Sequence, residues 1–166
     1  MKLTEKHVRE ARLVAIKCHG TQDYDGVFPY EKHLDDVVEV LKRFDIVAPK
    51  FMCAGYLHDS IEDGAISYSK IKIHFGEEVA EMVFCVTDEL GRNRAEKKMK
   101  TLPKTAKNPD AVILKLADRI ANIEHGGKVD MYAKEYPAFR LALDNPSIPD
   151  RMAKPLWDYL EILLKL

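Results

Sequence analysis

The sequence predicts an all-α protein with one domain. Apolar residues recur at spacings of three and four along most of the chain, as in amphipathic helices, and no alternating pattern is long enough to indicate a strand. The 166 residues suffice for one hydrophobic core but are too few for two ordinary domains. No internal repeat or low-complexity segment occurs, so we expect a single helical bundle over residues 1–166.

Capping and helix-breaking residues divide this pattern into helices. Thr4 can cap a first helix, Gly20 ends it, and residues 21–28 are expected to form a loop. Further helices are predicted at residues 29–44, 49–58, 67–76, 77–86, 111–124, 130–143 and 150–166. Residues 49–58 are apolar on nearly every side, which favours a central, buried helix. Residues 91–108 are rich in basic side chains, and no helix is assigned to them.

Composition and charge exclude several classes of function. The formal net charge of −1 produces no overall field that would attract nucleic acid or a membrane, so any anion-binding site must be local. No apolar stretch is long enough to cross a bilayer, and the N-terminal residues lack the apolar core of a secretory signal. Cys18, Cys53 and Cys85 lie in apolar helical patterns, as expected for reduced, buried thiols of a cytoplasmic protein. The sequence leaves the oligomeric state open, a homo-oligomer included.

Ionisable side chains cluster where the most apolar predicted helix ends. His58 and Asp59 are adjacent there, and Glu62 and Asp63 follow within one helical turn. Burying several such groups is costly unless they are paired or bind a metal. If the run is helical, Glu62 lies one turn beyond His58, and Asp63 lies one turn beyond Asp59. The run then presents two candidate metal ligands with two further carboxylates behind them.

Two more candidate ligands lie on other predicted helices. Asp118 is in an apolar helix, with Asn122 one turn later on the same face, and His33 is in the first turn of the helix after Pro29. Imidazoles and carboxylates are the ligands expected for Mn²⁺, Zn²⁺ or Fe²⁺, and four of them leave positions open for water, as a catalytic metal requires. Taken singly, each of these residues is more typical of a cap or a salt bridge. Their joint order favours a metal site.

The order of these groups resembles that of the HD phosphohydrolase superfamily. Within it, the sequence is most similar to the RelA/SpoT-type hydrolase domain and the small alarmone hydrolases. The matching motifs are HGTQ at 19–22, DG at 25–26, PYEKH at 29–33, LHDSIED at 57–63, FGEEVA at 75–80, VTD at 86–88 and KLADRIAN at 115–122. The resemblance covers about residues 10–124. It implies an HD-type helical domain, on which the helices of residues 130–166 are expected to pack.

The resemblance also implies roles for individual residues. The positions that match the family's metal ligands are His33, His58, Asp59 and Asp118. The resemblance implies that one divalent metal ion is bound. Mn²⁺ is the ion expected, and Zn²⁺, Fe²⁺, Co²⁺ or Ni²⁺ are alternatives. Glu62 and Asp63 match the acidic pair that orients or activates the attacking water, and Asn122 matches a residue that lines the nucleotide site. The reaction implied is hydrolysis of the 3′-pyrophosphate of (p)ppGpp through a metal-bound water.

A polyphosphate substrate also needs basic contacts. Residues 92–107 are the obvious source, and Arg94, Lys97 and Lys98 are the best placed of them, with a solvated basic face as the alternative. Asp23 and Tyr24 stand where the family typically carries a basic substrate contact. A carboxylate is unfavourable near a phosphate, whereas a tyrosine can stack on a base, so other phosphorylated nucleotides stay open as substrates.

Past the last predicted ligand, Tyr132 can border the pocket or pack in the core.

Three hypotheses about the function remain. The first is an alarmone pyrophosphohydrolase, and the second is an HD-family phosphatase or triphosphohydrolase that acts on (d)NMP, (d)NTP or NADPH. The third is a metal-binding regulatory module without turnover, although such a module would not need the acidic pair Glu62–Asp63.

Overall fold

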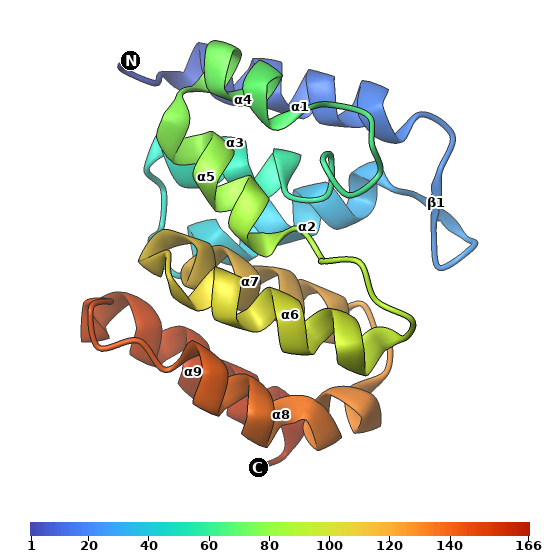
Figure 1. The fold of residues 1–166 in the computed structure, drawn as a ribbon, viewed down its shortest axis with the longest axis vertical. Coiled ribbons are helices and arrows are strands. Elements are labelled where there is room, and N and C mark those ends of the chain that lie inside the picture. The colour runs from blue at the N-terminus through green and yellow to red at the C-terminus, as the bar shows by residue number, and fades with distance from the viewer.

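A computed structural model describes residues 1–166, and its helices pack in layers with both termini at the surface (Figure 1). The helices are α1 (Glu5–His19), α2 (Glu31–Arg43), α3 (Pro49–Leu57), α4 (Tyr68–Phe75), α5 (Glu77–Val86), α6 (Arg94–Ala106), α7 (Pro109–Glu124), α8 (Val129–Leu143) and α9 (Asp150–Leu164). Two short strands, β1 (Asp23–Tyr24) and β2 (Phe28–Pro29), pair antiparallel with Tyr24 opposite Phe28. No helix is long and apolar enough to cross a membrane. The predicted all-α fold is confirmed.

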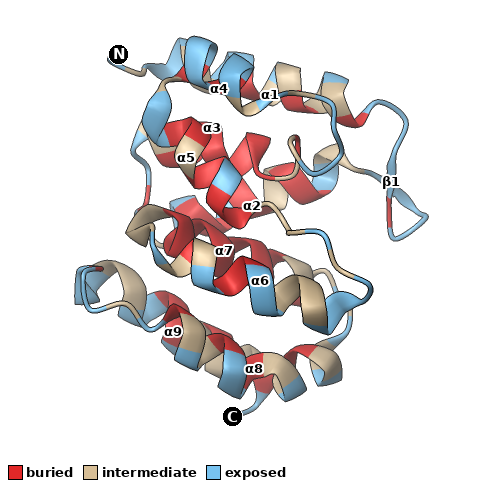
Figure 2. Ribbon diagram, viewed as in Figure 1, coloured by how far each residue is buried: buried red, intermediate tan, exposed pale blue.

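Helices α3 and α7 form the centre of the core. Every residue of 51–57 and of 111–121 is buried, and much of the red ribbon that marks buried residues in Figure 2 belongs to these helices. Helix α3 packs against α1, α2 and α5, and α7 packs against α2, α5 and α9. The prediction of a buried helix at residues 49–58 is therefore confirmed, and the central helices give the site a rigid frame.

A glycine sets the spacing between α2 and α3. A Cβ atom at Gly55 would lie 3.0 Å from Val38 Cγ2 and 3.2 Å from Leu41 Cδ1, closer than ordinary van der Waals contact. Gly55 therefore allows the two backbones to approach each other more closely than a larger residue would. This approach matters for the site, because α2 carries His33 and α3 leads directly into His58.

The C-terminal helices lie against one side of this core. Helix α8 packs against α6, and α9 packs against α7 and α8 (Figure 1). Phe139 and Leu143 of α8 and Leu156 and Leu160 of α9 are buried in the contact. The helices of residues 130–166 thus share one hydrophobic core with the rest of the chain.

The structure corrects the helix assignment for residues 91–108. They contain α6, which Asn93 caps by accepting a hydrogen bond from the Glu96 N–H at 2.9 Å. The buried face of α6 carries Thr101 and Thr105 beside Leu102, and the hydroxyl groups of both threonines bond to backbone carbonyls. A helix that buries hydroxyl groups lacks the continuous apolar stripe on which the sequence pattern depends.

Three further expectations need correction. The run from His58 to Asp63 forms successive turns after α3 rather than a helix, and Gly64 closes it with a positive φ of 69°. The expected loop at residues 21–28 contains β1 and part of β2. Cys53 and Cys85 are buried as predicted, but Cys18 is only half-buried, and all three thiols are free.

Candidate metal centre

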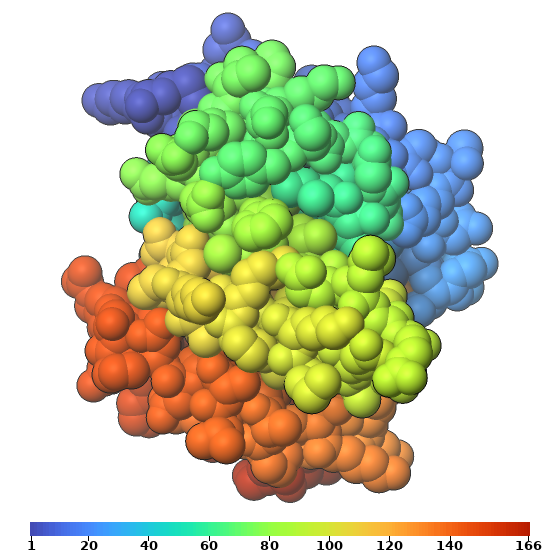
Figure 3. Space-filling model, viewed as in Figure 1, coloured from blue at the N-terminus to red at the C-terminus, as the bar shows by residue number.

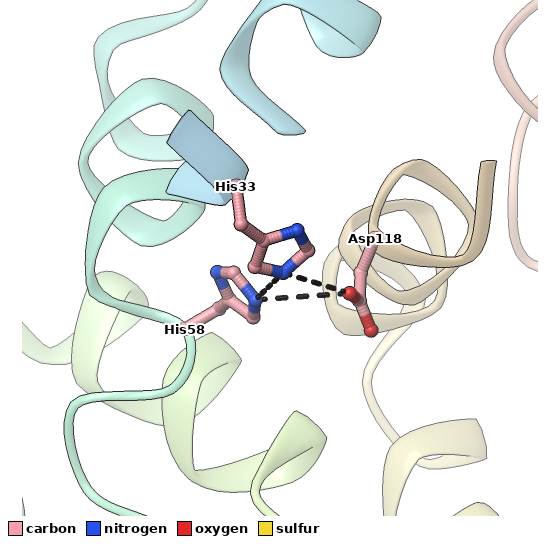
Figure 4. Close-up of side chains that lie close together, drawn as sticks. All are labelled: His33, His58 and Asp118. Atoms are coloured by element: carbon pink, nitrogen blue, oxygen red, sulfur yellow. Dashed lines mark hydrogen bonds and ion pairs between the residues drawn. The ribbon is translucent and has the colours of Figure 1, made fainter. Parts of the chain in front are cut away.

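Three side chains from different parts of the core converge on one space. His33 of α2, His58 just after α3 and Asp118 of α7 point toward one another (Figure 4). The Nε2 atoms of His33 and His58 are 3.2 Å apart. Asp118 Oδ1 lies 3.4 Å from His33 Nε2 and 3.7 Å from His58 Nε2. Two ligand atoms bound at right angles, each about 2.1 Å from one ion, are about 3.0 Å apart. The observed spacings are close to this value.

The donor chemistry of the cluster fits a divalent cation. The Nδ1–H of His58 donates to the Gly55 carbonyl at 2.8 Å, so deprotonation of this ring leaves the lone pair on Nε2, which faces the cluster. Both rings are almost completely buried, with 2% exposure for His33 and 1% for His58. Lone pairs gathered in a buried space are unfavourable unless a proton or a metal ion lies between them.

Asp59 lies at the edge of this cluster. Its Oδ2 atom is 2.9 Å from His58 Nε2 and 3.7 Å from His33 Nε2, and the Tyr30 hydroxyl donates to the same oxygen. Asp59 is not among the residues whose ligand atoms all lie within 4.8 Å of one another, which are His33, His58 and Asp118. Its role as a fourth ligand therefore stays a prediction.

Neighbours on α7 hold the Asp118 carboxylate in place. Lys115 Nζ donates to Oδ2 at 2.9 Å, and Asn122 Nδ2 donates to Oδ1 at 2.7 Å. The Tyr24 hydroxyl in turn donates to Asn122 Oδ1 at 3.0 Å. Burial alone would raise the pKa of Asp118, but Lys115 and the two histidines hold it well below its usual value. The carboxylate is therefore ionised, as a metal ligand must be.

A cavity of about 230 Å³ adjoins the cluster, and Glu62 is one of the residues that line it. The Asp88 N–H donates to Glu62 Oε2 at 3.2 Å. Partial desolvation raises the pKa of Glu62, and the negative charge of Asp59 raises it further. Asp63 does not line the cavity, and its Oδ2 atom lies 2.8 Å from His19 Nδ1 instead. The structure thus separates the two carboxylates that the sequence analysis treated as a pair.

The cavity wall also carries several cationic side chains. The basic side chains that line it are Arg94, Lys98, Lys115, Arg119 and Lys128. Lys98 Nζ lies 2.8 Å from both carboxylate oxygens of Asp88, and Arg94 and Arg119 both donate to Glu135, at 2.6 and 3.2 Å. Burial lowers the pKa of Lys98, and the nearby charge of Lys115 lowers it further. The cavity therefore joins a ligand cluster to a set of positive charges.

The predicted substrate contacts divide into two groups. Arg94, Lys98, Asn122 and Tyr132 line the cavity, whereas Lys97 does not. Tyr24 does not line the cavity either, because its ring packs between His33 and His125, with centroid distances of 4.9 and 4.2 Å. Tyr132 both borders the cavity and packs in the core, where the Arg119 guanidinium lies 4.8 Å from its ring centroid.

Sequence reasoning missed several residues of this site. No role at the site was predicted for Lys115 or Arg119, although a lysine and an arginine beside an aspartate in an apolar helix indicate buried charge pairing. Tyr30 belongs to one of the matching motifs, but no role was predicted for it. No role was predicted for Lys128 or Glu135 either, which both lie past the last ligand motif.

Comparison with known proteins identifies the family. A family model described as HD domain matches residues 11–136, a range that includes His33, His58 and Asp118. The chain belongs to the HD domain family. Human guanosine-3′,5′-bis(diphosphate) 3′-pyrophosphohydrolase MESH1 is 31% identical over 122 residues, which are 69% of this chain and 66% of that protein. The guanosine-3′,5′-bis(diphosphate) 3′-pyrophosphohydrolase of Aquifex aeolicus (strain VF5) is 32% identical over 124 residues. The match covers 72% of this chain and 18% of that protein.

Solved structures show the same fold. One, described as a metazoan ortholog of SpoT that hydrolyzes ppGpp, superposes with a TM-score of 0.81 at 22% identity, covering 99% of this chain and 97% of that one. Another, lmo0812 from Listeria monocytogenes EGD-e, gives a TM-score of 0.65 at 23% identity over 80% of this chain and 96% of that one. The resemblance to the RelA/SpoT group and the HD-type helical fold are thus confirmed. Of the two relatives compared by sequence, the chain spans 66% of the length of the human protein and 18% of the length of the Aquifex aeolicus protein.

Replacing Asp118 or Asp59 tests the ligand set. We expect Asp118→Ala to lower the affinity for Mn²⁺ by at least about a hundredfold, because the cluster loses its carboxylate and keeps the positive charge of Lys115. Asp59→Ala should cause a comparable loss if Asp59 is a fourth ligand. Isothermal titration calorimetry with MnCl₂ measures both, and Asp144→Ala, at an exposed carboxylate far along the chain, is the control. Wild-type affinity in Asp59→Ala would remove Asp59 from the ligand set.

Metal binding is expected to release a proton from His58. Burial lowers the pKa of this imidazole, but the adjacent Asp59 carboxylate raises it by more, and the pKa is about 9. The ring is therefore protonated at neutral pH without metal, and a metal must displace that proton. Affinity for Mn²⁺ should rise with pH up to about 9 and then level off. Calorimetry at pH 7 in buffers of different ionisation enthalpy counts the protons released, and none would be released if His58 were already neutral.

Proposed function

We propose that this protein is a metal-dependent pyrophosphohydrolase that removes the 3′-pyrophosphate from ppGpp or pppGpp. The observation that carries the proposal is one cavity lined both by His33 and Asp118 of the His–His–Asp cluster and by several cationic side chains. Such a cavity suits a substrate with several phosphate charges. The names of the relatives supply the choice of nucleotide.

The proposed metal site consists of His33, His58 and Asp118, with Asp59 at its edge. We propose Mn²⁺ as the native ion, because mixed imidazole and carboxylate ligands suit it. A divalent cation at this position lowers the pKa of a bound water and offsets negative charge on a phosphoryl oxygen. The free thiols of Cys18, Cys53 and Cys85 support a reducing compartment, so we place the reaction in the cytoplasm.

Glu62 is the proposed general base. It lines the cavity, and its raised pKa makes its carboxylate a better proton acceptor than an ordinary glutamate. Asp63 takes a positioning role in this proposal. It contacts His19, whose ring stacks on Tyr30 at a centroid distance of 4.3 Å, and Tyr30 donates to Asp59. This series of contacts lets Asp63 act on the metal site without touching the substrate.

The cationic wall is the proposed binding site for the phosphates. Lys98 and Arg94 reach the cavity from α6, and Arg119 reaches it from α7. The side chain of Asp23, which stands where relatives carry a basic contact, is exposed in β1 and does not line the cavity. The departure at this position therefore places no carboxylate beside the phosphates.

Product identification tests the proposed reaction. We expect purified protein with MnCl₂ to convert ppGpp and water into GDP and pyrophosphate, because the ligand cluster and the cations share one cavity. A parallel screen of pppGpp, GTP, GMP, (d)NTPs and NADPH, resolved by anion-exchange chromatography, measures the preference, and Asp118→Ala is the inactive control. Release of single phosphate, or turnover of NADPH or a (d)NMP alone, would identify a different HD-type phosphatase. Metal binding without turnover of any of these nucleotides would contradict catalysis.

Substitutions of the two carboxylates separate their roles. Glu62→Gln should lower kcat by about 10²–10⁴-fold while Mn²⁺ affinity stays at the wild-type value, because the proposed base is lost and the ligands are kept. Asp63→Asn should lower kcat less and also weaken Mn²⁺ binding through Tyr30 and Asp59. Steady-state kinetics and calorimetry on the same preparations measure both effects. Wild-type kcat in Glu62→Gln would remove the general-base role.

A further inference from the structure

Helices α6 and α8 run side by side in the same direction and enclose a second cavity. At the start of α6, Arg94 pairs with Glu135 in the middle of α8. Near their ends, Asn145 Nδ2 donates to the Ala106 carbonyl at 2.8 Å. A cavity of about 540 Å³ lies between the two helices, which Figure 3 shows as neighbouring yellow and orange surfaces. Its volume falls within the range of small-molecule sites.

Most of this groove is apolar. Its walls are Met99, Leu102 and Pro103 of α6 and Ala138, Phe139 and Ala142 of α8. The two alanines leave the space that larger residues would fill in a closed helix contact. The side chain of Met99 is 69% exposed beside it. An apolar recess that stays open to solvent between two packed helices indicates a binding site rather than core packing.

The polar residues of the groove lie at one end. Arg94 and Lys98 of α6 and Glu135 of α8 lie closer to the starts of their helices than Pro103 and Ala142 do. Arg119 of α7 joins them by donating to Glu135, and its guanidinium also lies 3.6 Å from the centroid of the Phe139 ring. From Arg94 to Pro103 the groove extends about 14 Å along α6. A ligand that matches it therefore has one polar end and an apolar body.

The polar end carries an excess of positive charge. Arg94 and Arg119 share the single carboxylate of Glu135, and Lys98 is paired with Asp88. The Arg119 side chain is 3% exposed, and its buried Nη1 has no hydrogen-bond acceptor. A second carboxylate or a phosphate near Arg94 and Arg119 would balance this charge.

We propose that the groove between α6 and α8 binds a small amphipathic anion. Its apolar body lies along Met99, Phe139 and Ala142, and its carboxylate or phosphate lies beside Arg94 and Arg119. The cavity volume of about 540 Å³ suits a small molecule. A stable protein partner would instead need an interface that buries roughly 1,000 Å² of surface. The shape and charge of the groove alone support this site, and it stands whether or not the proposed hydrolase reaction is correct.

The site also has a direct connection to the metal cavity. Arg94, Lys98 and Arg119 line both cavities. An anion held by these side chains reduces the positive charge available to a phosphorylated substrate on the other side. The bound anion therefore raises KM for ppGpp without changing kcat, and this second effect rests on the proposed function.

Titration with sodium octanoate tests the binding site directly. We expect saturable one-to-one binding by calorimetry, and binding of the uncharged 1-octanol should be about tenfold weaker because Arg119 gains no anionic partner. Ala138→Phe fills the groove and should weaken octanoate binding at least about tenfold. Leu141→Phe, at a residue that is 83% exposed on the same helix but does not line the groove, is the matched control and should bind like the wild type.

The outcomes separate the binding site from the activity. Octanoate binding that is lost in Ala138→Phe and kept in Leu141→Phe supports the site even if ppGpp is not hydrolysed. Equal binding in the wild type and Ala138→Phe, with circular dichroism showing both folded, overturns it, and so does equal affinity for octanoate and 1-octanol. Sedimentation could instead show that the wild type is a dimer and that Ala138→Phe dissociates it, while calorimetry detects no octanoate binding. The occupant of the groove would then be a second copy of this chain, and that result would also overturn the proposal.

Discussion

Helices α2, α3 and α7 must bring two imidazole rings and a carboxylate into one small buried space, and the rest of the site depends on this convergence. Each of these groups presents a lone pair, so the arrangement is stable only with a proton or a cation between them. The close contact of α2 and α3 at Gly55 positions His33 and His58, and the buried face of α7 positions Asp118. Because the core fixes these positions in advance, a metal ion pays little ordering entropy when it binds.

The Asp118 carboxylate interacts with two different sets of side chains. Asp118 lies at the boundary, with the histidines on one side and Lys115 on the other. Lys115 stabilises the ionised carboxylate and also begins the cationic wall that continues to Lys98 and Arg119. A single buried aspartate thus interacts with both the histidines of the ligand cluster and the lysine of the cationic wall. This coupling explains why α7 buries charged residues along a face that would otherwise be entirely apolar.

The convergence of His33, His58 and Asp118 could be predicted because their order along the chain and their apolar surroundings are properties of the sequence. The conformation of residues 58–64 could not, because a run of polar residues after a buried helix can continue the helix or form turns, and tertiary contacts decide. Those turns place Glu62 at the cavity and Asp63 beside His19. Helix α6 was missed for a related reason, since Thr101 and Thr105 satisfy their buried hydroxyl groups through backbone contacts that no periodicity reveals.

Two carboxylates already hold three of the side chains of the cationic wall. Glu135 orders Arg94 and Arg119, and Asp88 orders Lys98, so these long side chains lose little rotational freedom when a phosphate arrives. The acids also weaken the attraction of the wall for an anion that binds by charge alone, because such an anion must compete with them. A substrate with several phosphate charges competes better than one with a single charge. At the metal cavity the pairing therefore favours polyphosphates over anions that bind by charge alone, and this preference follows from the carboxylates as much as from the cations.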